Sequence, residues 1–202
     1  NHNIKIIEDN AESIGAQYKG KLLGTFGDVS TYSFFGNKII TTGEGGAILT
    51  NKEEIAIKCR ELRDHGMSHQ KKYHHTDLGY NYRMTNMQAA IGLAQMEKLD
   101  EILALRNKQM DFYYSEFSNV KGITVRKYAE WCKSVHWMMT ITLDVDYDRD
   151  DFLLYMKDNG IDCRQMINPV HNAEHFASEF TNTQFSNAVN ISNQSVHLPS
   201  SK

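Results

Sequence analysis

Lys38 stands where a lysine amine could carry out covalent chemistry on a carbonyl group. It follows an apolar and aromatic run and a Gly36-Asn37 turn. A tight loop at the end of a strand can hold the side chain in one place while its amine stays accessible. Schiff-base formation needs a neutral amine, which desolvation or neighbouring cations favour. A solvated surface lysine is the alternative, and position alone does not decide between the two.

Asp9 and Ser33 add groups that fit such chemistry. Asp9 closes a short apolar run that we interpret as a buried strand, where a carboxylate is costly without a charged partner. The protonated ring nitrogen of pyridoxal 5'-phosphate (PLP) is one such partner. Ser33, five residues before Lys38, could donate a hydrogen bond to a phosphate oxygen. Simpler roles stay open, because Asp9 could cap the following turn and Ser33 could bond within its sheet.

A glycine cluster follows Lys38. Gly43, Gly45 and Gly46 do not precede a lysine and a helix, so they match neither a P-loop nor a dinucleotide-binding fingerprint. We interpret the cluster as a tight reversal that only glycine allows, which brings a strand back beside the Lys38 loop.

The composition is that of a globular protein and excludes several functional classes. Of the 202 residues, 41% are hydrophobic and 23% are charged, and the formal net charge is -3. We therefore expect binding neither to nucleic acid nor to a membrane, and the apolar runs are too short to cross a bilayer. His69 and the pair His74-His75 lack metal-site spacing, so no metal is expected. The three cysteines are expected to be reduced thiols of a cytoplasmic protein.

The order of the predicted elements indicates an α/β protein with a smaller second domain. Residues 1–110 are expected to form the C-terminal part of a large sheet domain with a long connecting helix, and residues 111–202 a small α+β domain truncated at its end. Trp137 is interpreted as part of the small-domain core. Because the chain opens at Asn1 without a start methionine, we expect that an upstream segment has been lost. Predicted strands cover residues 4–9, 29–35, 47–50, 123–125, 137–143 and 161–167, and predicted helices cover residues 52–65, 86–117 and 151–159.

Six ordered motifs carry a family resemblance. They are IEDNAESIGA at residues 7–16, GTFGD at 24–28, SFFGNK at 33–38, TTGEGG at 41–46, LGYNYRMT at 78–85 and QAAIGLAQ at 88–95. In residue identity and spacing they resemble the DegT/DnrJ/EryC1/StrS sugar aminotransferases, most strongly over residues 4–106. The resemblance implies the fold-type I aminotransferase fold without its N-terminal half, where the family carries a Gly-Thr phosphate-binding turn. We expect the isolated chain to have little or no activity.

The resemblance also implies roles around the cofactor PLP. Lys38 would form the Schiff base and move protons between the substrate and the cofactor. Asp9 would pair with the ring nitrogen, and Ser33 would bind the phosphate. Glu12 falls near the ring hydroxyl, where the family often has Gln or His.

Two further cofactor-binding residues are implied on one loop. Asn81 would reach the phosphate of the neighbouring subunit's cofactor, and Arg83 would help from the same loop. This arrangement implies a homodimer with shared active sites.

The resemblance implies transamination of a nucleotide-linked 4-keto-6-deoxyhexose with glutamate as the amino donor. Residues 33–38 and 73–85 look most like the branch that aminates GDP-4-keto-6-deoxymannose. Three alternatives remain, namely amination at C3 of another nucleotide sugar, a sugar 3-dehydratase, and a non-catalytic remnant that serves as a dimerisation module. The dehydratases have histidine in place of the lysine, so Lys38 argues against that activity.

Overall fold

The computed structural model describes residues 2–176, 178–180 and 185–200, and the chain divides into two compact units. The first consists of residues 1–105 and 128–137, and the second of residues 106–127 and 138–202. Residues 128–137 group with the first unit, in which β7 (Cys132–Lys133) pairs with β2 (Gln17–Tyr18). β2 also pairs with β3 (Lys21–Leu22). The division of the chain into domains of residues 1–110 and 111–202 remains a prediction.

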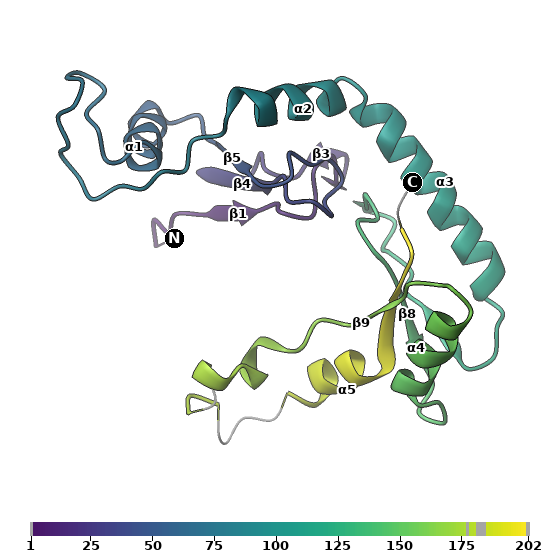
Figure 1. Ribbon diagram of the computed structural model, residues 1–202. Helices are drawn as coiled ribbons and strands as arrows, with labels where there is room; N and C mark the ends of the chain where they lie inside the picture. Colours follow the sequence, from purple (N-terminus) through teal and green to yellow (C-terminus); the bar gives the residue numbers. More distant parts are fainter. Residues whose placement is uncertain (1, 177, 181–184, 201–202) are drawn as a thin grey trace. The chain divides into compact units, whose positions relative to one another are not determined.

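A three-stranded sheet lies at the centre of the first unit (Figure 1). β1 (Ile7–Asp9) and β5 (Gly46–Leu49) flank β4 (Val29–Ser33), to which β1 is parallel and β5 antiparallel. The three predicted strands of this region are present. β1 and β4 are shorter than predicted, whereas β5 has its predicted length. The interpretation of the first strand as buried is wrong, because Ile7 is 71% exposed and Asp9 is exposed as well. Gly43 and Gly45 have φ angles of 80° and 134°, which glycine adopts readily. The expected reversal before β5 is therefore present.

Two helices and the start of a third complete the first unit. They are α1 (Glu53–Arg63), α2 (Asn86–Met96) and the first residues of α3 (Leu99–Phe117). The prediction of one continuous helix over residues 86–117 is wrong, because the chain breaks it at residues 97–98. Neither residue at the break is a glycine or a proline, so the sequence contains no helix-breaking residue that would predict the break.

The apolar core of the first unit includes the two residues that follow Lys38. Ile39 and Ile40 are 5% and 1% exposed, and their burial anchors the loop. The other buried members of this cluster are Ala16, Ile102 and Val135. Trp137 packs against the same cluster. The prediction that Trp137 belongs to the small-domain core is therefore wrong.

A four-stranded antiparallel sheet organises the second unit. Its strand order is β6 (Ile123–Val125), β8 (Met139–Leu143), β10 (Ser195–Leu198) and β9 (Arg164–Gln165). The predicted strand over residues 161–167 shrinks to β9, because only Arg164 and Gln165 pair with β10.

Two helices and two short 3-10 helices accompany this sheet. They are α4 (Arg149–Asp158), η1 (Val170–Asn172), η2 (Glu174–Phe176) and α5 (Ser186–Gln194). Asp148 caps α4, since its side chain accepts hydrogen bonds from the backbone N–H groups of Asp150 and Asp151.

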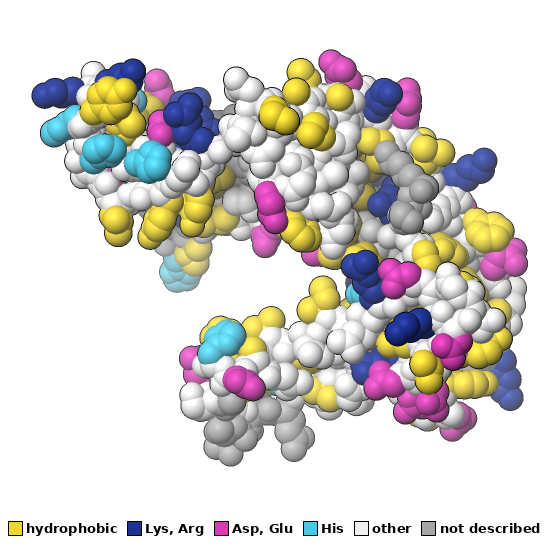
Figure 2. All heavy atoms as spheres, viewed as in Figure 1, with side chains coloured by type: hydrophobic (Ala, Val, Ile, Leu, Met, Phe, Trp, Pro, Cys, Tyr) yellow, Lys and Arg dark blue, Asp and Glu magenta, His cyan; other side chains and the backbone are white. Residues whose placement is uncertain are grey.

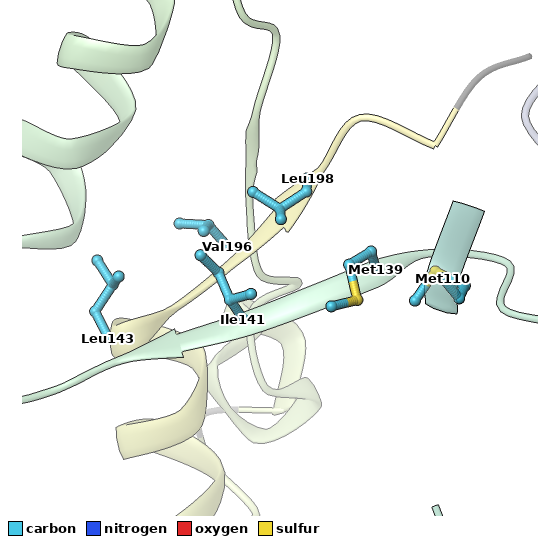
Figure 3. Packing of buried hydrophobic residues seen from close by; sticks show 6 residues of the cluster. All are labelled: Met110, Met139, Ile141, Leu143, Val196 and Leu198. Carbon is cyan, nitrogen blue, oxygen red and sulfur yellow. The ribbon is translucent and has the colours of Figure 1, made fainter. Parts of the chain in front are cut away.

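The core of the second unit is built from one helix and two strands (Figure 3). It joins α3 to β8 and β10, and its side chains lie within a small, closely packed cluster. The buried residues are Met110, Met139, Ile141, Leu143, Val196 and Leu198.

Histidine side chains gather around α1 and the loop that follows it (Figure 2). Across the described residues, no group of three or more His, Cys, Asp or Glu side chains is arranged to hold a metal ion. Within the same residues, no helix has both the length and the apolar character to cross a membrane.

Candidate functional site

Asp9 and Ser33 lie at one edge of the first unit's sheet and on one of its faces. β1 and β4 are parallel, so their carboxyl ends meet at the same edge, and Asp9 is in register with Thr31. Residues paired in register point to the same face, as do residues two apart along a strand. Since Ser33 lies two residues beyond Thr31, it shares the face of Asp9.

Lys38 lies in the loop that leaves this edge, and its amine is paired. The Nζ atom lies 3.2 Å from Oε1 of Glu12 in an ion pair. The Lys38 side chain is only 13% exposed, whereas that of Glu12 is 52% exposed. The Lys38 backbone N–H donates to the carbonyl of Phe35 at 3.0 Å, which closes the turn. The structure thus brings together two of the predicted site residues, Lys38 and Glu12.

Trp137 is a member of this site that the sequence analysis missed. Its ring centroid lies 4.0 Å from Nζ of Lys38, within the range of a cation–π interaction. Its indole Nε1–H donates to the carbonyl oxygen of Asn37 at 2.8 Å. One hundred residues separate Trp137 from Asn37, and no local motif connects them. Only the grouping of residues 128–137 with the first unit brings the ring here.

The loop after Lys38 is braced by α2. The side-chain Oε1 of Gln95 accepts from the backbone N–H of Thr41 at 3.0 Å, and its Nε2 donates to the carbonyl of Thr41 at 2.5 Å. α2 itself begins at a capping box, in which Thr85 and Gln88 exchange side-chain and backbone hydrogen bonds. A well-started helix therefore holds the chain three residues beyond the lysine.

Asp9 has the local role that was left open for it, whereas Ser33 bonds to the turn after β4 and not within its sheet. Oδ1 of Asp9 accepts from the backbone N–H of Ala11 at 3.0 Å, so this carboxylate caps the following turn. The hydroxyl oxygen of Ser33 accepts from the backbone N–H of Phe35 at 3.3 Å. Neither bond uses up the group, because a carboxylate has a second oxygen and a hydroxyl has a proton to donate.

Asn81 and Arg83 lie on an exposed segment that contacts the end of α1. Asn81 forms an isolated antiparallel bridge with Asp64, and Arg83 Nη1 lies 3.4 Å from Oδ2 of the same residue. Arg83 is thus paired with Asp64, whereas Lys38 is paired with Glu12. The structure does not gather Asn81 and Arg83 around the Lys38 amine.

Glu8 fixes the loop that carries the motif at residues 24–28. Its carboxylate accepts from the backbone N–H groups of Gly24 and Phe26 at 2.7 Å each and of Gly27 at 2.5 Å. Burial by itself raises the pKa of this carboxyl, but the three hydrogen bonds and the nearby Lys21 together hold its pKa below the usual 4.5. The ionised carboxylate of Glu8, the residue before Asp9, therefore holds the loop at residues 24–28 in place.

A separate hollow of about 950 Å³ lies between α1 and the β4–β5 side of the sheet. Its lining includes Arg60, Arg63 and Arg83, together with residues of β5. Lys38 and Asp9 do not line it. The hollow is therefore distinct from the surroundings of the lysine amine.

Lys38, Asp9 and Ser33 carry the three kinds of group that PLP chemistry uses. A primary amine can bind an aldehyde carbon, a carboxylate can pair with a protonated ring nitrogen, and a hydroxyl can donate to a phosphate. Asp9 and Ser33 share one face at the same edge of the sheet, and Lys38 lies in the loop that follows Ser33.

The chain matches one protein family and curated members of it along most of its length. The model of the DegT/DnrJ/EryC1/StrS aminotransferase family matches residues 1–202. The GDP-perosamine synthase of Vibrio cholerae is 38% identical over 201 residues, which cover 98% of this chain and 54% of that protein. The GDP-perosamine synthase of Caulobacter vibrioides is 44% identical over 173 residues, which cover 84% of this chain and 47% of that protein. The chain thus spans about half the length of the curated relatives it matches.

Solved structures share the fold. Helicobacter pylori PseC, an aminotransferase involved in the biosynthesis of pseudoaminic acid, matches with a TM-score of 0.89 at 25% identity, covering 98% of this chain and 54% of PseC. DesV of S. venezuelae, solved in complex with a ketimine intermediate, matches with a TM-score of 0.88 at 30% identity, covering 98% of this chain and 53% of DesV. The expected α/β class with the fold of the sugar aminotransferases is therefore confirmed.

Proposed function

The chain belongs to the DegT/DnrJ/EryC1/StrS aminotransferase family, and from this premise we propose that the protein aminates a nucleotide-linked 4-keto-6-deoxyhexose with PLP as its cofactor. Two relatives named GDP-perosamine synthase support this substrate class. We propose glutamate as the amino donor and Lys38 as the catalytic residue.

The confinement of the Lys38 amine is the observation that carries this proposal. A lysine side chain is ordinarily solvated, yet this one is 13% exposed and lies between a carboxylate and an indole ring. The carboxylate at the end of β1 and the hydroxyl at the end of β4 share one face at the same edge. Such an arrangement suits a group that must present a reactive amine to a bound cofactor.

When bound, PLP supplies an electron sink that stabilises negative charge on the substrate carbon beside the nitrogen. Asp9 would keep the proton on the ring nitrogen by pairing with it, and Ser33 would orient the phosphate. Lys38 would hold the cofactor through its Nζ atom, and its amine, once freed, would move the proton between the substrate carbon and the cofactor. Glu12 would receive the Lys38 ammonium whenever that amine is released, since the two already form an ion pair.

We further propose that the active protein is a homodimer in which each site uses residues of both subunits. Asn81 and Arg83 lie on an exposed segment and contact the end of α1, where a second subunit can reach them. Asn81 would bind the phosphate in the partner's site, and Arg83 would support that loop through Asp64.

Replacement of the lysine tests the proposed function. In the protein as it is encoded, Lys38→Ala should abolish the visible absorbance of lysine-bound PLP and reduce transamination by at least about a thousandfold, as expected for loss of a covalent catalyst. Borohydride reduction of the unaltered protein should fix the cofactor on the peptide that contains Lys38. Lys121→Ala, at an exposed lysine, is the matched control and should keep both properties. Turnover retained by Lys38→Ala would refute the assignment.

A further inference from the structure

We propose that Trp137 is a positioning residue for Lys38, which its indole ring holds in the orientation needed for reaction. This inference rests on the proposed function, because the orientation of Lys38 matters only if its amine reacts. It assigns a role in the site to a residue that the sequence places far from every motif.

Two contacts from one rigid side chain act on consecutive residues. The indole N–H donates to the carbonyl oxygen of Asn37 at 2.8 Å, which fixes the backbone immediately before the lysine. The face of the same ring lies 4.0 Å from Nζ of Lys38, which fixes the far end of the side chain. A long, flexible lysine is thereby restrained at both ends, and the entropy of its other rotamers is removed before reaction.

The amine has two different neighbours. Glu12 approaches Nζ at 3.2 Å as a charge partner, and Trp137 offers the aromatic ring that binds a cation best. Glu12 is 52% exposed, so water weakens its attraction for the amine. The ring excludes water where it covers the amine, so the position of Nζ depends on Trp137 as well as on the ion pair.

Trp137 is itself held by the core under the loop. It packs against the cluster that contains Ile39 and Ile40, the two residues after Lys38. The ring therefore moves with the loop that it orients. A purely structural tryptophan would stabilise this cluster, but it would not control the reactivity of one lysine amine.

Lysine labelling separates these two roles. In cofactor-free protein, the rate at which trinitrobenzenesulfonate modifies Lys38 is followed by peptide mass spectrometry in unaltered protein and in Trp137→Leu and Trp137→Phe. Loss of the ring both uncovers the amine and removes its attraction for the ammonium form. Trp137→Leu should therefore raise the rate about fivefold, the factor that corresponds to about 1 kcal/mol. Trp137→Phe retains a ring face but loses the N–H that binds the Asn37 carbonyl, so it should raise the rate less than Trp137→Leu does.

The control is the same substitution at the other tryptophan. Trp131 is 54% exposed and packs edge-on against Tyr18, so Trp131→Leu should leave the Lys38 rate unchanged. Thermal unfolding is recorded for every variant, and Trp137→Met serves as the ring-free variant if Trp137→Leu does not fold. Unchanged labelling of Lys38 in the folded ring-free variant would overturn the inference, as would equal acceleration in Trp131→Leu.

Borohydride trapping keeps the two proposals apart. If reduction of the PLP-loaded, unaltered protein leaves no cofactor on Lys38, the proposed function fails whatever the labelling shows. If it traps the cofactor there, Trp137→Leu should slow the formation of the lysine-bound absorbance after PLP is added. Trp137→Phe, which keeps the ring face but not the N–H donor, should slow it less. Unchanged kinetics in Trp137→Leu would then refute the role of Trp137 and leave the proposed function intact.

Discussion

Glu8 shows how a single side chain stabilises the framework beside the site. Its carboxylate collects three backbone N–H groups of one loop, and these bonds require the ionised form. Since its folded-state pKa is held below 4.5, the folded protein stabilises the ionised carboxylate more than the unfolded chain does. The stability that it contributes is present above the usual pKa and is lost as the pH falls through the folded-state pKa.

Glu8→Gln should therefore destabilise the protein at neutral pH by roughly 1–3 kcal/mol, because the amide is a weaker acceptor and places one NH₂ against a donor. The difference in unfolding free energy between the two proteins should shrink as the pH falls through the folded-state pKa of Glu8, which lies below 4.5. Thermal or urea unfolding between pH 3 and 7 measures it. Glu130→Gln, at an exposed position, is the control. An equal decrease in unfolding free energy in both variants would contradict the stabilising role of Glu8.

The residues proposed to bind the cofactor were easier to predict from the sequence than the residue that contacts Lys38 from a distant part of the chain. Asp9, Ser33 and Lys38 stand at strand ends within recognisable motifs, and the parallel pairing of β1 and β4 places the first two on one face. Trp137 has no such context, because its contacts to Asn37 and Lys38 span about a hundred residues. The roles of Asp9, Glu12, Ser33, Asn81 and Arg83 toward a cofactor remain predictions.

At the scale of elements, α2 positions the segment that follows the lysine. Gln95 bonds both the N–H and the carbonyl of Thr41. Gln95→Leu removes both bonds, so amide exchange at Thr41 should accelerate by about five- to tenfold, as expected for a lost hydrogen bond. Hydrogen exchange measured by NMR or mass spectrometry checks it.

Gln95→Glu provides the matched comparison. The carboxylate keeps an acceptor for the Thr41 N–H but loses the donor to its carbonyl, so the protection of that amide should persist. The Thr42 N–H, which donates to the carbonyl of Phe34 at 2.9 Å, is an internal reference. Equal exchange at Thr41 in Gln95→Leu and in the unaltered protein would show that α2 does not brace the loop.

Element boundaries reveal where local patterns fail. The strands with β-branched or aromatic runs were predicted, as were α1 and α4. The break between α2 and α3 carries no local signal. Five of the nine residues of α5 are Ser or Asn, which are weak indicators of a helix. β10 is fully buried and pairs with both β8 and β9, so its existence depends on long-range pairing that no short window contains.

At the scale of the whole molecule, the described sheet of the first unit leaves apolar groups uncovered. Ile7 of β1 is 71% exposed, and Ile48 and Leu49 of β5 are 52% and 54% exposed. Both are edge strands of this sheet, and exposed apolar edges favour association with further polypeptide. Because the chain spans about half the length of its relatives, activity must be measured in the protein as it is encoded.

Complementation between inactive variants tests the proposed shared site at this scale. If Lys38 acts in one subunit and Asn81 reaches across from the other, Lys38→Ala and Asn81→Ala homodimers each have two defective sites. A mixed dimer then has one site with both defects and one with neither. Random exchange of subunits should restore about a quarter of the unaltered activity, because half of the dimers are mixed and each has one intact site of two.

The outcome depends on geometry alone. If Lys38 and Asn81 serve the same site within one subunit, every site in a mixed dimer has one defect, and mixing restores nothing. Two different affinity tags on the two variants verify subunit exchange, because mixed dimers then carry both tags. Mixed dimers that carry both tags but recover no activity would place both residues in one subunit's site and exclude the shared arrangement.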